Sequence, residues 1–248
     1  MPEIARDGFS MHYARAGEGF GLLLIPGALG TGAGDFHAQI DAFAPFFDVI
    51  APDPRGYGHS RPPERDFPLD FYHRDAGDML ALMTALGHAR FHIIGWSDGA
   101  NIAAIMAATA PGRVAKLVMF GGQSFLTAQD IAAMNAVRDI AAWSPRAAEA
   151  MRAVYGEELE ALWSRYVDGQ EALLAAGGDL YQALLARIRC PAFILHGAQD
   201  PLVPGSHPEA IHRALPGSRF HVFPGGKHNI HVKYAEAFNA MVLDFLTA

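Results

Sequence analysis

Cysteine and positive charge are both scarce in this sequence. Cys190 is the one cysteine, so the chain cannot form an internal disulfide, and no Cys/His spacing suggests a zinc site. Lys and Arg total 19 against 26 Asp and Glu, which gives a net charge of −7. Binding to nucleic acid needs clustered Lys and Arg to neutralise phosphates, and no such cluster occurs. We therefore expect no nucleic-acid partner, no metal and no cofactor.

Long apolar runs are also missing. No stretch approaches the roughly 18 apolar residues that a membrane span requires, and residues 1–8 lack the basic and then apolar pattern of a signal sequence. We therefore expect a cytoplasmic protein that has no membrane partner. The sequence leaves its oligomeric state open.

The residues that are present favour a folded α/β protein. Hydrophobic residues make up 51% of the 248 and charged residues 18%, which is enough for a sizeable core. Short apolar runs alternate with segments of helical spacing, as in a mostly parallel sheet with helices on both faces. Strands are expected at 3–15 (two, around Asp7-Gly8), 22–25, 46–51, 91–94, 114–120, 192–195 and 219–223, and helices at 71–86, from 98 to 110, 208–215 and 232–246.

The alternation stops between residues 123 and 186. This segment has the spacing of several helices and carries Trp143, Tyr155, Trp163, Tyr166 and Tyr181. We interpret it as a helical cap inserted between two strands. The predicted organisation is a core at 1–122, a cap at 123–186 and the second part of the core at 187–248.

A serine framed by glycines follows the strand expected at 91–94. In Gly95-Trp96-Ser97-Asp98-Gly99, Ser97 falls at a sharp turn from strand to helix, where side chains at 95 and 99 would collide with neighbouring elements. Such a turn exposes the serine hydroxyl above the sheet. We therefore predict that Ser97 is a nucleophile, although a short Gly-x-Ser-x-Gly pattern also occurs in ordinary tight turns.

A nucleophilic serine needs a base and an acid that orients the base. Asp200 and His228 each follow a strand expected late in the chain, in the order that this type of site requires. We predict that Ser97, Asp200 and His228 form a triad. His196 and His231 are rival bases, and Asp53 is a weaker rival acid because its strand precedes the serine.

Two backbone amides are candidates for an oxyanion hole. One belongs to Asp98, at the start of a helix, and the other to Leu29, in the loop after the strand at 22–25. The glycines that follow, at 30, 32 and 34, superficially suggest a dinucleotide-binding turn. Gly-x-Gly-x-x-Gly starting at Gly30 would require a glycine where Asp35 stands, so we disfavour that interpretation.

The charge of the Asp98 side chain indicates what kind of substrate the protein would bind. A carboxylate beside the nucleophile opposes the oxyanion unless a cation lies against it, and a substrate ammonium would supply one. The alternative is that Asp98 only complements the helix N-terminus. The cap supports the first interpretation modestly, because residues 122–186 hold nine acidic residues and four arginines.

The motifs resemble those of the α/β-hydrolase superfamily, and within it the hydrolases of amino acid esters. The residues that carry the resemblance are Asp53 to Pro63, Gly95 to Gly99, Gly197 to Pro204 and Gly226 to Asn229. The resemblance implies a serine hydrolase of α-amino acid esters with Ser97, Asp200 and His228 as the triad. It also implies that Asp98 anchors the α-ammonium group of a small-molecule ester.

Two other functions stay open at this point. A carbon-carbon bond hydrolase of aromatic ring-cleavage products uses the same triad and cap, although its substrates are anionic and Asp98 argues against them. The chain could also be a catalytically inactive binding protein with a hydrolase fold. Relatives with an aspartate nucleophile are disfavoured because position 97 is serine.

Overall fold

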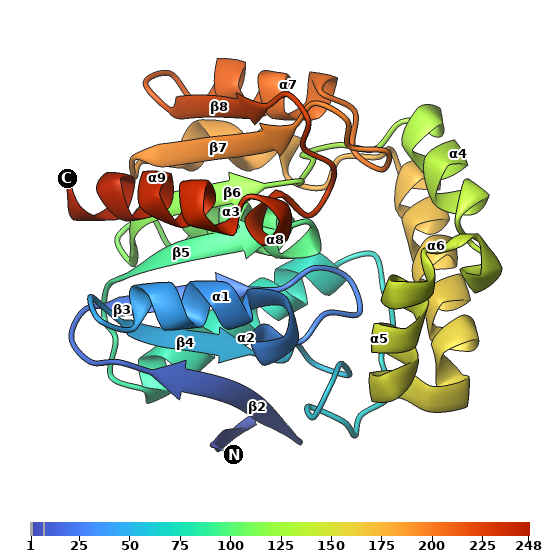
Figure 1. The fold of residues 1–248 in the computed structure, drawn as a ribbon, viewed down its shortest axis with the longest axis horizontal. Helices are drawn as coiled ribbons and strands as arrows, with labels where there is room; N and C mark the ends of the chain where they lie inside the picture. The colour runs from blue at the N-terminus through green and yellow to red at the C-terminus, as the bar shows by residue number, and fades with distance from the viewer. Residues whose placement is uncertain (1, 7) are drawn as a thin grey trace.

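The sheet at the centre of the molecule is mostly parallel (Figure 1). The computed structural model describes residues 2–6 and 8–248, and these form an eight-stranded sheet in the order β1-β2-β4-β3-β5-β6-β7-β8. β1 and β2 pair antiparallel, as do β2 and β4, while the remaining pairs are parallel. The strands are β1 (Glu3–Arg6), β2 (Phe9–Ala16), β3 (Gly21–Ile25), β4 (Asp48–Pro52), β5 (Phe91–Trp96), β6 (Val114–Phe120), β7 (Ala192–Gly197) and β8 (Arg219–Phe223).

Helices cover both faces of this sheet, which confirms the predicted fold class. Alternate side chains of β3 enter different layers. Leu22 and Leu24 pack in a cluster with residues of α1 and α9, while Leu23 and Ile25 pack with residues of α2, α3 and α7. One face carries α1 (Gly32–Phe43), α8 (Ile230–Lys233) and α9 (Ala235–Thr247), and the other carries α2 (Phe71–Ala85), α3 (Asp98–Thr109) and α7 (Ser206–Ala214).

Helix α1 was not expected from the sequence. Its first residues are the glycine-rich stretch after Gly30, and Thr31 caps it by accepting a hydrogen bond from the Gly34 amide at 3.1 Å. A Cβ atom at Gly32 would lie 2.1 Å from the carbonyl oxygen of Ala51, so only glycine allows the first turn to lie this close to β4. The glycines therefore bring a helix against the sheet.

Other boundaries differ from expectation by smaller amounts. The last helix, expected at 232–246, is divided into α8 and α9 at Tyr234, whose φ of −120° and ψ of 39° are not helical. Of the turn expected at Asp7-Gly8, Asp7 lies outside the described residues. No helix in the described part of the chain is long and apolar enough to cross a membrane.

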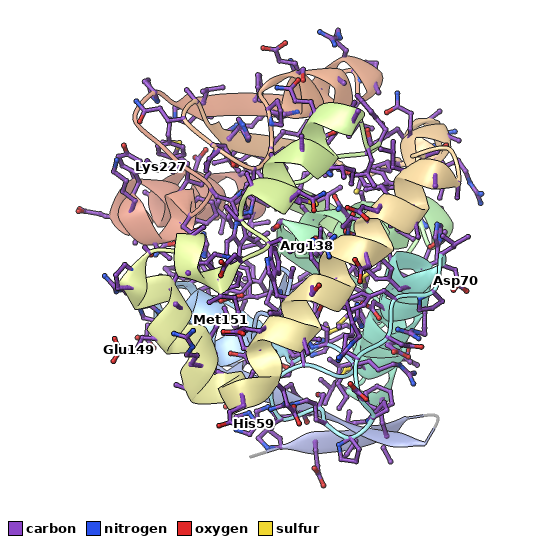
Figure 2. All side chains as sticks on the ribbon, turned by 90° about the vertical axis from the view of Figure 1, so that its right-hand side faces the viewer. His59, Asp70, Arg138, Glu149, Met151 and Lys227 are labelled. Atoms are coloured by element: carbon purple, nitrogen blue, oxygen red, sulfur yellow. The ribbon has the colours of Figure 1, made fainter. Side chains whose placement is uncertain are left out.

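The segment between β6 and β7 lies at one end of the sheet. Figure 1 shows α4, α5 and α6 beyond the carboxyl ends of the parallel strands, and Figure 2 looks onto this side of the molecule. Residues 124–126 and 178–180 run side by side at its base, where the Leu126 amide donates to the Gly178 carbonyl at 2.7 Å. The helices are α4 (Ala128–Ala136), α5 (Pro145–Tyr155) and α6 (Leu159–Ala175), with short 3-10 turns at Ile140–Ala142, Gly156–Glu158 and Gln182–Arg187. We keep the name cap for 123–186, and the domain boundaries stay a prediction.

Candidate active site

Ser97 lies at a sharp turn between β5 and α3. Its φ of 55° and ψ of −121° fall in a strained region for a residue with a side chain. A Cβ atom at Gly95 would lie 2.2 Å from the Gly99 carbonyl oxygen, and one at Gly99 would lie 2.0 Å from the Ile25 carbonyl oxygen. Both glycines are therefore needed for the turn. Ser97 is partly exposed at the carboxyl edge of the sheet, next to the cap.

Asp200 and His228 form a hydrogen-bonded pair at the same edge. His228 Nδ1 lies 2.7 Å from Asp200 Oδ2, and the amides of Leu202 and Val203 donate to Asp200 Oδ1 at 2.9 and 3.1 Å. Burial acts to raise the pKa of Asp200, but the charge of His228 and these hydrogen bonds outweigh it, so the pKa is lowered. The pair can hold an imidazole with a fixed orientation and stabilise its positive charge.

Shared neighbours bring Ser97 and His228 close together. The indole nitrogen of Trp96, the residue before the serine, donates to the His228 carbonyl at 3.1 Å. A Cβ atom at Gly121 would lie 3.1 Å from His228 Cε1, and the preceding residue, Phe120, accepts a hydrogen bond from the Ser97 amide at 2.9 Å. The structure therefore places all three predicted residues at one edge of the sheet. The Ser97 hydroxyl itself makes no hydrogen bond within the described residues, and such catalytic contacts often tighten only when substrate binds.

The rival residues have other partners. His231 is 1% exposed, lies with its Nε2 3.1 Å from the Asp35 carbonyl oxygen, and burial lowers its pKa to about 3. Burial also lowers the pKa of His196, which is 2% exposed on β7. Asp53 Oδ2 lies 3.2 Å from a ring nitrogen of His12 and 3.2 Å from one of His59, and makes no hydrogen bond with His228 in the described residues. These contacts favour structural roles for the rivals.

The loop between β3 and α1 passes directly beside the serine. A Cβ atom at Gly27 would lie 3.2 Å from Ser97 Cβ, and the Gly30 amide donates to the Gly27 carbonyl at 3.0 Å. Leu29 adopts a φ of 60°, which is unusual for a branched residue. Within the described residues, neither the Leu29 amide nor the Asp98 amide donates a hydrogen bond. Two unpaired N–H groups near a serine can stabilise a developing negative charge.

Asp98 is buried among tyrosines. It is 6% exposed, and its Oδ1 accepts hydrogen bonds from the hydroxyls of Tyr72 at 2.6 Å and Tyr166 at 2.9 Å. Its Oδ2 accepts none from the described residues and is not among the fully enclosed unpaired atoms. Burial raises the pKa of Asp98 to about 6, against the opposing effects of these hydroxyls and of the Arg65 charge. The site therefore holds a carboxylate whose charge the protein stabilises incompletely.

Sequence reasoning missed the residues around Asp98. Tyr72 is on α2, and both Tyr166 and Gln170 are on α6, where Gln170 donates to the Tyr72 hydroxyl at 2.9 Å. Tyr166 was noted only as one of the aromatic residues of the cap. These residues lie 26 and 68 positions from Asp98 or farther, so no local pattern links them to it.

One cluster in the described residues has the composition of a metal site. His12, Asp53 and His59 offer ligand atoms within 4.8 Å of one another. However, the Gly32 amide donates to Asp53 Oδ1 at 3.0 Å, and the His59 amide donates to Asp53 Oδ2 at 2.9 Å. The ring nitrogens of His12 and His59 each lie 3.2 Å from the same Oδ2. The protein therefore already satisfies this carboxylate, and the cluster acts as a hydrogen-bond network that fixes the loop from Asp53 to Ser60.

Comparison with known proteins defines the class. The family model for the alpha/beta hydrolase fold matches residues 22–161 and 139–233. The chain belongs to this family and is a hydrolase. It is 43% identical to the serine hydrolase BPHL of Homo sapiens, a match that covers 98% of this chain and 85% of the human protein. This confirms the expected resemblance to the biphenyl hydrolase-like (valacyclovir hydrolase) branch of the superfamily.

More distant relatives include hydrolases named for other substrates. The chain is 28% identical to a 2-hydroxy-6-oxononadienedioate/2-hydroxy-6-oxononatrienedioate hydrolase of Pseudomonas sp, over 96% of this chain and 92% of that protein. A solved structure of a meta-cleavage product hydrolase from Pseudomonas fluorescens aligns with a TM-score of 0.84 at 21% identity, covering 100% of this chain and 97% of the other. At this identity the structural match shows the fold alone.

Proposed function

We propose that this enzyme is a serine hydrolase that cleaves carboxylic esters of α-amino acids with a free ammonium group. Ser97 is the nucleophile, His228 the general base and Asp200 the residue that orients His228. The close pairing of Asp200 with His228 and the partly exposed, strained position of Ser97 support these roles. The similarity to a named serine hydrolase over nearly the whole chain supports the reaction class.

The reaction follows from the positions of these groups. His228 removes the proton of Ser97, whose oxygen attacks the ester carbonyl. The amides of Leu29 and Asp98 stabilise the negative charge of the tetrahedral intermediate. His228 then gives its proton to the departing alcohol, which leaves an acyl-enzyme. A water molecule activated by His228 attacks this ester and releases the amino acid.

The proposed substrate rests on the surroundings of Asp98. Its Oδ1 is occupied by two tyrosine hydroxyls, while its Oδ2 has no partner among the described residues. A carboxylate that the protein neutralised fully would have a lowered pKa, whereas burial raises the pKa of Asp98 to about 6. A cationic group on the substrate would supply the missing stabilisation.

The attraction between Asp98 and a substrate ammonium is strong enough to make the enzyme prefer esters that carry this group. An ammonium about 5 Å from the carboxylate is attracted by on the order of 3 kcal/mol at an effective dielectric near 20. That energy corresponds to roughly a 100-fold preference before desolvation is subtracted. The α-ammonium of an aminoacyl group lies one carbon from the carbonyl that Ser97 attacks, so a residue next to Ser97 is well placed to bind it.

Cleavage of carbon-carbon bonds in ring-cleavage products is the second candidate. The identity to the nonadienedioate hydrolase favours it. Those substrates are anionic, and a buried carboxylate next to the nucleophile would repel them. We therefore rank this activity below amino acid ester hydrolysis, and an inactive binding protein below both.

Two measurements on the wild-type protein test the proposal. The first is labelling by a fluorophosphonate, with Ser97→Ala as the control. A wild-type protein that never reacts would exclude a serine hydrolase. The second compares kcat/KM for an alanyl ester and the matching propionyl ester, which differ only in the ammonium group. We expect the alanyl ester to be preferred by roughly 100-fold, and an equal rate for the two esters contradicts the proposed substrate.

A further inference from the structure

The cap and the loop beside Ser97 are joined through one hydroxyl group. Tyr155, the last residue of α5, donates a hydrogen bond to the Leu29 carbonyl at 2.8 Å. The same hydroxyl accepts a hydrogen bond from the Gly58 amide at 3.1 Å. Tyr155 is 3% exposed, so both bonds are shielded from water. A side chain of the cap therefore binds two core loops, one of which carries a predicted oxyanion donor.

Arg61 fixes the ring of this tyrosine. Its guanidinium lies 4.7 Å from the centre of the Tyr155 ring. It also donates to the Gly58 carbonyl at 3.0 Å on the core and to the Val154 carbonyl at 3.0 Å on the cap. Figure 2 shows His59, the neighbour of Gly58, near the place where α5 meets α6. The tyrosine hydroxyl thus has little freedom to leave Leu29 while the cap stays in place.

The Leu29 backbone needs such support. Its φ of 60° lies in the left-handed region, where a branched side chain is disfavoured. Its amide has no hydrogen-bond partner in the described residues, and the hydroxyl of Tyr155 is the partner of its carbonyl. Without that bond, rotation of the Leu29 backbone toward an ordinary conformation would turn its N–H away from the serine.

We propose that Tyr155 is a positioning residue that couples the position of the cap to the oxyanion hole. When the cap is in place, the Tyr155 hydroxyl holds the Leu29 carbonyl, and this keeps the Leu29 N–H directed at the reacting carbonyl. When the cap moves away, the bond is lost and the hole loses one donor. The inference rests on the role that the proposed function gives to Leu29, but it is independent of the acyl group that the enzyme prefers.

The test is Tyr155→Phe, which removes only the hydroxyl. Loss of one complete oxyanion donor lowers kcat by about 100-fold or more, so a donor that is only released from its position should cost about 10-fold in kcat. KM should stay nearly constant, because the hydroxyl does not touch the substrate. The loss should be equal for the alanyl and propionyl esters, whereas a defect at Asp98 would affect only the alanyl ester.

Tyr181→Phe is the matched control. Tyr181 is 2% exposed, and its hydroxyl is buried without a hydrogen-bond partner among the described residues. Its removal should leave kcat unchanged. If a folded Tyr155→Phe protein keeps the wild-type kcat on both esters, or loses no more than Tyr181→Phe does, the coupling does not exist.

Hydrogen exchange gives a readout that does not depend on turnover. In the full-length Tyr155→Phe protein, the Gly30 amide, which is hydrogen-bonded to the Gly27 carbonyl in the loop segment 27–31, should exchange about 10-fold faster than in the wild type, the expected effect of losing one buried hydrogen bond. Exchange at the same segment in Tyr181→Phe should match the wild type. Unchanged exchange at 27–31 in Tyr155→Phe contradicts the coupling, whether or not the wild-type enzyme hydrolyses either ester. A wild-type enzyme that hydrolyses neither ester would contradict only the proposed function.

Discussion

Two buried carboxylates close to Ser97 differ in how completely the protein stabilises their charge. Asp200 receives two backbone amides and the His228 imidazole, and its pKa is lowered. Asp98 receives two tyrosine hydroxyls on one oxygen only, and burial raises its pKa to about 6. The first carboxylate has hydrogen-bond partners within the chain on both of its oxygens. The second has one oxygen without a partner among the described residues.

This difference separates two kinds of function. A carboxylate that is fully bonded can hold an imidazole in one orientation, which the predicted triad would need for every ester. A carboxylate that lacks a cation can select a substrate that brings one. Changes at Asp200 should therefore affect all esters equally, and changes around Asp98 should affect only those that carry an ammonium group.

The largest effect is expected from Asp200→Asn. The amide cannot stabilise the charged His228, and it favours the wrong tautomer of the imidazole, so kcat should fall by about 10⁴-fold. The alanyl and propionyl esters should lose the same factor. The measurement is kcat and KM for both esters.

Asp168→Asn is the control for this prediction, because Asp168 is an exposed carboxylate of the cap, paired with Arg138. It should keep nearly full activity. A loss in Asp200→Asn that is confined to the alanyl ester would show that Asp200, and not Asp98, recognises the ammonium group.

The next largest effect is the change with pH in the preference for the alanyl ester. Asp98 must be ionised to bind an ammonium, and its pKa of about 6 lies above the usual value for aspartate. Taking the ratio of kcat/KM for the alanyl ester to that for the propionyl ester cancels the pH dependence of the bond-cleaving steps, which both reactions share. This ratio should fall about 10-fold for each unit of pH below about 6.

The same ratio should also fall on the alkaline side, because an α-ammonium loses its proton at about pH 7.7. A bell-shaped ratio with its maximum at about pH 7 is therefore expected for the wild type. A ratio that does not change between about pH 5 and pH 7 would show that the charge of Asp98 has no part in the preference.

The smallest effect is expected from Tyr166→Phe. This change removes one of the two hydroxyls that stabilise ionised Asp98, so the pKa of Asp98 should rise further above its usual value. The ester ratio should fall by roughly threefold at about pH 6.5 and recover at higher pH. A Tyr166→Phe profile that overlays the wild-type profile would mean that this hydroxyl does not tune Asp98.

The sequence predicted the parts of the fold that depend on local patterns. Short apolar runs bounded by turn residues located the parallel strands, because strands buried on both faces need continuous hydrophobic sequence. The spacing of Gly95, Ser97 and Gly99 located the turn above the sheet, since only glycine fits at its two ends. Helix α1 was missed because its first residues are glycines, and contact with β4 outweighs their low helix propensity.

The surroundings of Asp98 could not be predicted in the same way. Tyr72 and Tyr166 reach it from α2 and from the cap, and their contacts depend on how the cap sits over the sheet. The bond between Tyr155 and Leu29 spans 126 positions for the same reason. A single sequence gives the chemical type of these residues but carries no pattern for pairs that meet only in the folded chain.

Asp98→Asn tests the central claim most directly. Asparagine keeps the shape and the Oδ1 acceptor for Tyr72 and Tyr166, but it removes the negative charge. At about pH 7, kcat/KM for the alanyl ester should fall by roughly 100-fold while that for the propionyl ester stays within about threefold of the wild type. If the Asp98→Asn protein still prefers the alanyl ester as strongly as the wild type does, Asp98 does not select the substrate.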